Sequence, residues 1–326
     1  MATVPEIPIT HSILRADALA EVIADRYDLG GSVYAELLSR GVNDVYLLRV
    51  DGARYVARVL RAGFRSLDQV IYEMALIRFH VGHGLDAAAP VPDRTGNDFI
   101  TVAALEGDRF VSVFSWAEGA PMGGHAGPDD AFRLGGRVAR MHEHARRFVP
   151  PADVHVDTPS FLARHRPALM EMVGGNSTAG RLYADLIDKV SARLNELDVP
   201  YGACHGDIHT HNVFLSGGGR LTFLDWDNCG ADFFAKELMH FVWRNDYLGV
   251  DPGLNEAFLA GYDAERPLSA AERDLLPFFL TVRHLFILCG MAGMINVVGR
   301  SAVGYAHQLA RFEALIEEPA RRAGLL

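Results

Sequence analysis

Three polar side chains in the second half of the sequence have the types and spacing of a magnesium and phosphate site. Asp207 precedes Asn212 by five residues, and Asp225 follows after two short apolar runs, 213–215 and 221–224. Carboxylate and amide oxygens suit Mg²⁺, which usually takes one or two protein ligands together with substrate phosphates. A third acid, not needed for the metal, can orient an attacking hydroxyl and accept its proton. The set therefore indicates phosphoryl-transfer chemistry.

A β-hairpin is expected to bring these side chains together. The turn 216–220 between the two apolar runs contains three glycines, which tolerate positive φ, so the pattern predicts a hairpin. The two ends of a hairpin lie side by side. Asn212 and Asp225 are therefore expected to be neighbours, with Asp207 on the loop that leads in.

The ordered set of motifs resembles the aminoglycoside phosphotransferase and choline kinase family of the protein-kinase-like superfamily. Residues 205–212 read H-G-D-x-x-x-x-N, with the Asp-to-Asn spacing of the protein-kinase catalytic loop, and 225–227 read DWD. This family uses H-G-D in place of H-R-D. The resemblance implies roles for five residues: catalytic base Asp207, magnesium ligands Asn212, Asp225 and Asp227, and His205 as structural support of the catalytic loop.

The resemblance also implies the fold, an α+β, bilobal protein-kinase-like architecture. We expect an N-terminal nucleotide-binding lobe at 1–113, a hinge at 114–119 and a larger, mainly helical lobe at 120–326, which is catalytic and binds the substrate. Apolar patterns and turn residues agree, since they predict three antiparallel strands within 33–60 and a helix over 67–81.

Helical spacing and stop signals predict the remaining elements. The expected helices are 17–27, 129–148, 161–173, 178–197, 233–244, 252–262, 269–280, 281–298 and 302–317, and two further strands are expected at 99–103 and 109–114. Arg283, His284 and Asn296 interrupt the apolar stretch 280–298, so we interpret it as a buried helix.

The family places ATP between the lobes and implies a set of nucleotide-binding residues in the first lobe. Arg58 stands on the third strand, where kinase-like folds place a cation for the α and β phosphates, and it replaces the Lys that many members use. The loop over the phosphates has one glycine and is not G-x-G-x-x-G. The expected set is Arg58, its partner Glu73, Gly41 and Asn43 of that loop, and hinge backbone groups near Ser115 and Ala117. The hinge does not exclude GTP.

Composition narrows the class of protein. The 326 residues carry a formal charge of −10, with acidic excess in both halves, so neither half is a basic nucleic-acid platform. Three cysteines without a CxxC pair make no disulfide framework. The first residues lack the basic start and apolar segment of a signal peptide. We expect a cytoplasmic enzyme without nucleic-acid or membrane partners, and the oligomeric state stays open.

The expected reaction is ATP-dependent transfer of the γ-phosphoryl group to a hydroxyl of a small molecule, such as an aminoglycoside-like antibiotic, an amino alcohol or a sugar-like metabolite. Two alternatives on the same fold are a protein Ser/Thr kinase and a catalytically weak, nucleotide-binding regulatory protein. A remote alternative is a metal-dependent hydrolase built on His205, Asp207, His209 and His211, which leaves the hairpin unexplained. Acids that are candidates for binding a cationic acceptor are Asp246, Asp251, Glu256 and Asp263.

Overall fold

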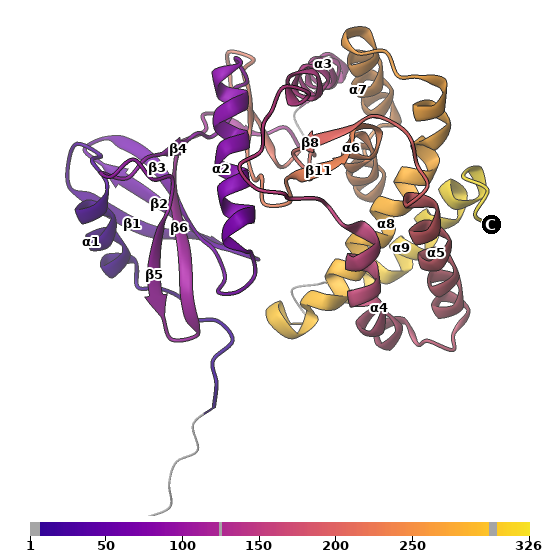
Figure 1. The fold of residues 1–326 in the computed structure, drawn as a ribbon, viewed down its shortest axis with the longest axis horizontal. Helices are drawn as coiled ribbons and strands as arrows, with labels where there is room; N and C mark the ends of the chain where they lie inside the picture. The colour runs from indigo at the N-terminus through magenta and orange to yellow at the C-terminus, as the bar shows by residue number, and fades with distance from the viewer. Residues whose placement is uncertain (1–6, 124–125, 300–304) are drawn as a thin grey trace, which may run out of the picture. The chain divides into compact units, whose positions relative to one another are not determined.

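The chain is described by a computed structural model covering residues 7–123, 126–299 and 305–326 (Figure 1). It forms two compact units. Unit 1 comprises Met1–Glu118 and Pro150–Ala152, and unit 2 comprises Gly119–Val149 and Asp153–Leu326. Both units combine helices with antiparallel strands, so the predicted α+β class is confirmed.

Unit 1 is a six-stranded antiparallel sheet with two helices. Its elements are α1 (Ala16–Arg26), β1 (Val33–Arg40), β2 (Asp44–Val50), β3 (Ala53–Val59), α2 (Leu67–Gly82), β4 (Pro90–Val91), β5 (Ile100–Ala104) and β6 (Gly107–Ser115). The strands follow the order β1-β2-β3-β6-β4, and β5 pairs with β6. The Asp51-Gly52 turn between β2 and β3 has positive φ at both residues, 46° and 89°, as a two-residue hairpin turn requires.

The two helices of unit 1 use opposite faces of its sheet. Ala57 and Val59 belong to the apolar core that contains the buried face of α1. Arg58 alternates with them along β3 and contacts Glu73 of α2. Because successive side chains of a strand point to opposite faces, α2 covers the face that presents Arg58.

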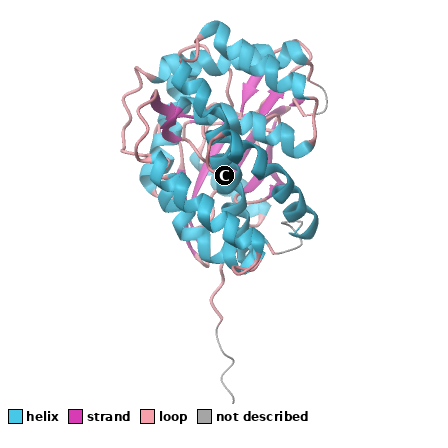
Figure 2. Ribbon diagram, turned by 90° about the vertical axis from the view of Figure 1, so that its right-hand side faces the viewer, coloured by secondary structure: helices cyan, strands magenta, loops and turns pink. Residues whose placement is uncertain are grey.

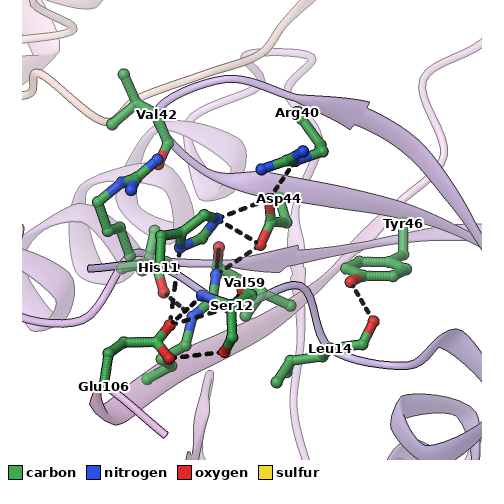
Figure 3. Close-up of polar contacts among 12 residues, drawn as sticks. His11, Ser12, Leu14, Arg40, Val42, Asp44, Tyr46, Val59 and Glu106 are labelled. Carbon is green, nitrogen blue, oxygen red and sulfur yellow. Dashed lines mark hydrogen bonds and ion pairs between the residues drawn. The ribbon is translucent and has the colours of Figure 1, made fainter. Parts of the chain in front are cut away.

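A buried polar network attaches the segment before α1 to this sheet (Figure 3). Arg109 is fully buried and donates to Asp44 Oδ2 and to the Ser12 carbonyl, each at 2.8 Å. His11 Nε2 lies 3.2 Å from Asp44 Oδ1, and the Ser12 amide donates to Glu106 at 3.0 Å. A buried guanidinium is tolerated only when its charge is paired. Since β2 begins at Asp44, the network also fixes one end of the β1–β2 turn.

Unit 2 is mainly helical, and helices predominate around the C-terminus in Figure 2. Its elements are β7 (Ala120–Pro121), α3 (Pro128–Ala145), α4 (Thr158–Val173), α5 (Thr178–Leu194), β8 (Tyr201–Cys204), β9 (Val213–Leu215), β10 (Leu221–Phe223), β11 (Gly230–Phe233), α6 (Phe234–Leu248), α7 (Pro252–Glu265), α8 (Ala270–Val298) and α9 (Tyr305–Arg322). Two small sheets, β10-β9-β7 and β11-β8, lie among these helices.

Several sequence predictions for unit 2 need correction. The two helices predicted at 269–280 and 281–298 are one continuous helix, α8. Helix α4 begins at Thr158, three residues before the predicted start at 161, and a proline in its first turn is favourable. The sequence also missed β8 and β11, and α6 starts after β11 at 234. Residues 302–304 of the last predicted helix lie outside the described residues.

Helix α8 contains the one segment, among the described residues, that is long and apolar enough to cross a membrane. This segment, Ala270–Ile295, has 61% of its most apolar window buried within the protein. Arg283 and His284 lie in its middle and are themselves buried. The burial favours a core helix, as the interrupted apolar pattern predicts.

Candidate functional site

The loop between β8 and β9 carries the candidate catalytic residues, and Gly206 determines its path. Gly206 has a φ of +85°, a region that favours glycine. A Cβ atom at this position would lie 2.0 Å from the Asn228 carbonyl oxygen. Any side chain would therefore force the loop away from the segment after Asp227.

The predicted hairpin is present and brings Asn212 to the backbone that leads into Asp225. Strands β9 and β10 pair with Val213 opposite Phe223, and the Leu224 amide donates to the Asn212 carbonyl at 2.8 Å. Asp225 follows with a φ of 58°, an uncommon and strained conformation for a residue with a side chain.

The turn of the hairpin differs in detail from the prediction. Of its three glycines, Gly217, Gly218 and Gly219, only Gly219 adopts positive φ, at 78°. One left-handed residue is therefore enough to close this turn.

Asp207 lies at the centre of a group of hydrogen-bond donors. Its Oδ1 pairs with the Arg283 guanidinium of α8, and its Oδ2 accepts a hydrogen bond of 3.3 Å from Asn212 Nδ2. His209 Nε2 lies 3.6 Å from Oδ2. Burial alone would raise the pKa of Asp207, but the charge of Arg283, helped by His209 and His240, holds it well below its usual value. Asp207 is therefore an ionised acceptor at neutral pH.

Asn212 has an orientation that suits a metal ligand. Its Nδ2 donates to the Asp207 carbonyl at 3.0 Å and to the Asp207 carboxylate, so the amide is held by its nitrogen. No hydrogen bond among the described residues uses Oδ1, although the side chain is largely buried. Amide and carboxylate oxygens, as on Asn212, Asp225 and Asp227, are the hard donors that Mg²⁺ prefers, so the chemistry of these three side chains fits that ion.

His205 links the catalytic loop to the end of the hairpin. Its Nε2 bonds the Leu224 carbonyl at 2.9 Å, and its Nδ1 accepts from the Asp207 amide at 3.3 Å. The ring packs on Trp226, with centroids 4.3 Å apart. Burial lowers the pKa of His205, which agrees with a neutral imidazole that donates from one nitrogen and accepts at the other.

Glu237 of α6 holds the loop between β8 and β9 through a hydrogen bond to its backbone. Its Oε1 accepts from the Gly206 amide at 2.5 Å, and its Oε2 lies 2.7 Å from His142 Nε2. His142 Nδ1 in turn contacts the Tyr262 hydroxyl at 2.7 Å. His142, Glu237 and Cys204 form the one group of three possible metal ligands found among the described residues. Because hydrogen bonds already engage the ligand atoms of His142 and Glu237, we interpret the group as structural.

The metal-hydrolase alternative has no support in this geometry. Within the described residues, no three ligand atoms from His205, Asp207, His209 and His211 come together as a metal site. Both ring nitrogens of His205 are used by backbone groups.

Arg58 and Glu73 meet in unit 1. Arg58 Nη2 donates to Glu73 Oε1 at 2.7 Å, and the Arg58 guanidinium lies 4.9 Å from the centre of the Phe114 ring. Arg65, which the sequence reading did not single out, pairs with the other Glu73 oxygen. Burial would raise the pKa of Glu73, but the two guanidinium groups outweigh it, and the pKa is lowered. The pairs fix the direction of the Arg58 side chain.

The other predicted nucleotide-binding positions also lie in unit 1. The Gly41 amide donates to the Asn43 carbonyl at 3.0 Å, which closes the β1–β2 turn. The Ser115 amide donates to the Ala89 carbonyl at 2.9 Å, and Ser115 Oγ accepts from the Ala89 amide. These bonds occupy the Ser115 amide within the sheet.

Sequence reasoning missed Arg283 as a site residue. This arginine lies 76 positions beyond Asp207, and only the packing of α8 brings the two together. A signal was present, because Arg283 and His284 interrupt an apolar stretch, and a charge within a buried helix requires a partner. Arg244 and His240 of α6, which also influence Asp207, had no such signal.

A family profile described as the phosphotransferase enzyme family matches residues 35–273. The chain belongs to this family. The predicted resemblance and the predicted enzyme class, a phosphotransferase with an alcohol group as acceptor, are thereby confirmed. An uncharacterized protein of Deinococcus radiodurans is 31% identical over 308 residues, which cover 91% of this chain and 88% of that protein.

Solved structures of phosphotransferases share the fold. A microcompartment-associated aminopropanol kinase matches with a TM-score of 0.79 at 24% identity, covering 95% of this chain and 99% of that one. Amicoumacin kinase hAmiN, in complex with AMP-PNP, Ca²⁺ and Ami, matches with a TM-score of 0.78 at 22% identity and 93% coverage of both chains. The predicted protein-kinase-like fold is therefore confirmed.

Proposed function

We propose that this phosphotransferase moves the γ-phosphoryl group of ATP to a hydroxyl group of a small molecule, with Asp207 as the catalytic base. The observation that supports the proposal is the environment of Asp207. Its carboxylate is ionised, 19% exposed, and held by Arg283 and Asn212, so one face of it remains available to a hydroxyl. An acceptor in this position orients the nucleophile, which is most of what phosphoryl transfer requires of the protein.

The proposed reaction balances as a simple displacement. The acceptor oxygen forms a bond to the γ-phosphorus as the bond from that phosphorus to its bridging oxygen breaks. The electron pair of the broken bond leaves with ADP, and Asp207 takes the hydroxyl proton.

Asn212 and Asp225 are the proposed magnesium ligands, with Asp227 as a supplementary ligand. The amide oxygen of Asn212 makes no hydrogen bond among the described residues, and its nitrogen is anchored on Asp207. Bound Mg²⁺ neutralises and orients the phosphates in reactions of this class.

Arg58 is the proposed contact for the α and β phosphates. Glu73, which also pairs with Arg65, holds its side chain, and a pre-oriented guanidinium loses little freedom when it binds an anion. Further nucleotide contacts are proposed at Gly41, Asn43, Ser115 and Ala117.

Substitution of the two central acids tests the proposal. We expect Asp207→Asn and Asp225→Ala to lower kcat by about 10²- to 10⁴-fold. Asp207→Asn also leaves the buried Arg283 without its counter-charge, so activity is measured well below the unfolding midpoint of each variant. ADP release is measured across a panel of hydroxyl compounds, with ATP and GTP in parallel and with magnesium varied. Asp185→Asn, an exposed acid that pairs with Lys189, serves as the control. Turnover like that of the wild type in either variant would contradict the assignment.

The acceptor is the less determined part of the proposal. The names of the two similar solved structures suggest an amino alcohol or an antibiotic. Nucleotide binding without transfer to any member of a broad panel would instead favour the nucleotide-binding regulatory protein. Phosphorylation of a protein substrate in preference to all small molecules would favour the protein kinase.

A further inference from the structure

Basic side chains surround Asp207 within unit 2. Arg283 of α8 pairs with it directly, and His209 lies on its other side. On α6, Lys236, His240 and Arg244 recur every four residues and so share one face of the helix. Lys236 and Arg244 are cations, whereas burial holds the pKa of His240 well below its usual value. Lys236 and His240 line a small cavity together with Gly206 and Arg283, so this face of α6 lies towards the loop that carries Asp207.

Existing partners account for two of the cations. Lys236 Nζ donates to Asp232 at 2.6 Å and to Thr158 at 2.7 Å. The charge of Arg283 is balanced by Asp207 itself, although Arg283 Nε is buried without a hydrogen bond among the described residues.

Arg244 is the cation without a counter-charge in contact. Within the described residues it makes no ion pair and no hydrogen bond, and its Nε is buried. Burial lowers the pKa of Arg244, and the charge of Asp207 partly counteracts this effect. A half-buried guanidinium that lacks an acceptor is costly, and an anionic ligand would remove that cost.

The acids considered for a cationic acceptor have other roles. Asp251 accepts from the Gly253 amide at the start of α7, and Asp263 accepts from the Leu268 amide and pairs with Arg273. Asp246 accepts from Asn255. Three of the four acids are thus engaged in local structure, which does not favour them as partners of a protonated amine.

We propose that the phosphate acceptor carries a carboxylate, and that Arg244 binds this carboxylate while Arg283 holds Asp207 beside it. The inference rests on the proposed function and names the chemical class of its substrate, a hydroxy acid or hydroxy amino acid. In this arrangement Arg244 is a specificity-determining residue. Arg283 is a positioning residue that acts through Asp207.

Matched acceptors test the charge preference. We would compare two hydroxy acids of different chain length, 3-hydroxypropanoate and 4-hydroxybutanoate, and the hydroxy amino acid L-homoserine with their primary amides and with the corresponding amino alcohols. ADP release and formation of the phosphorylated product are both followed. We expect the wild type to prefer the acids by about 10- to 100-fold in kcat/KM, which is the size of a charge-assisted contact.

Substitutions distinguish the proposed roles of Arg244 and Arg283. Arg244→Gln is expected to raise KM for the acids by about 10- to 100-fold and to remove the preference over the amides, whereas Arg244→Lys retains part of it. Arg283→Gln is expected to lower kcat with every acceptor, because it frees Asp207. Arg273→Gln, an exposed arginine of the same helix, is the matched control and should change neither quantity.

The outcomes distinguish the two levels of the proposal. Transfer to amides or amino alcohols at least as fast as to acids contradicts the carboxylate inference alone. An equal loss with all acceptors in Arg244→Gln, with a raised KM for ATP, also contradicts it, because Arg244 would then serve the nucleotide. Transfer to no acceptor, with ATP turnover unaffected by Asp207→Asn, contradicts the proposed function itself.

Discussion

Glu237 is the residue that connects the catalytic loop to the helical core. Its two oxygens accept from the Gly206 amide and contact His142, and all three groups are buried. Burial would raise the pKa of Glu237, but its contacts, led by the hydrogen bond with His142, lower it. The carboxylate therefore stays ionised and holds the backbone immediately before Asp207.

Replacing Glu237 should destabilise unit 2. In Glu237→Ala the Gly206 amide and His142 Nε2 lose a buried acceptor, so we expect the free energy of unfolding to fall by about 3 kcal/mol or more. Urea unfolding at neutral pH measures the change. Glu313→Ala, at an exposed position on α9, should stay within about 0.5 kcal/mol. A loss below about 1 kcal/mol in Glu237→Ala would show that the loop does not depend on this contact.

His284 should make stability depend on pH. It is buried, its Nδ1 accepts from Trp243 Nε1 at 3.3 Å, and burial lowers its pKa from 6.5 to about 3. Below pH 6.5 the unfolded chain binds a proton that the folded chain does not. This group should therefore remove about 2 kcal/mol of stability between pH 7 and pH 5.

The variant His284→Gln isolates this contribution. Glutamine cannot be protonated in this range and can still accept from Trp243. We expect the variant to lose about 2 kcal/mol less than the wild type between pH 7 and pH 5, measured by urea unfolding at both values. An equal loss of unfolding free energy in the two proteins between pH 7 and pH 5 would contradict a neutral, buried His284.

At the scale of elements, α3 and α7 pack through reciprocal glycines. A Cβ atom on Gly135 of α3 would lie 1.9 Å from the Phe258 carbonyl oxygen, and one on Gly261 of α7 would lie 1.9 Å from the Phe132 carbonyl oxygen. The obstacles are backbone atoms, which cannot rotate away. The two helices must separate to admit any larger residue.

Gly135→Ala should therefore be destabilising despite the better helix propensity of alanine. We expect a loss of about 3 kcal/mol, at the upper end for overpacking, in chemical unfolding. Gly290→Ala in α8 is the control, because its Cβ would meet Phe161 at an ordinary 3.5 Å, and it should be neutral or stabilising by up to about 1 kcal/mol. An equal effect of both substitutions would rule out close helix packing as the cause.

Elements that depend on local signals were predictable from the sequence. The helix α2 and the hairpin β9–β10 were placed correctly because periodicity and turn residues define them. Strands β8 and β11 were missed because they are four residues long and pair with each other across 26 positions. Helix α8 was divided into two because its pattern changes from amphipathic to mainly apolar near residue 280.

In the candidate site too, only residues close together in the sequence could be predicted as one group. Asp207, Asn212 and Asp225 lie within nineteen residues, so their spacing alone indicates a common site. Arg283 and Arg244 reach Asp207 only through the packing of α6 and α8, which no local pattern encodes. The sequence therefore predicted the class of reaction, whereas the basic residues around Asp207 became visible only in the structure.

At the scale of the whole molecule, the proposed groups are divided between two units with separate cores. Arg58 and Glu73 belong to unit 1, and Asp207, Asn212 and Asp225 belong to unit 2. A ligand that binds the folded protein stabilises it by an amount set by its concentration and Kd. Nucleotide binding can therefore be measured by stability, independently of any acceptor.

AMP-PNP with MgCl₂ should raise the unfolding temperature of the wild type, and Arg58→Ala should lose most of this shift. At a ligand concentration of about one hundred times Kd, the stabilisation is about 2.7 kcal/mol. Loss of a charge-assisted phosphate contact weakens Kd by about 30-fold, which leaves about 1 kcal/mol. Scanning calorimetry with and without ligand separates this effect from destabilisation of the free protein.

Arg49→Ala, which replaces an exposed arginine on the same sheet, is the control and should keep the full shift. A full shift in Arg58→Ala would place the phosphates elsewhere. Omission of magnesium should reduce the shift of the wild type, because the proposed roles of Asn212 and Asp225 require the metal.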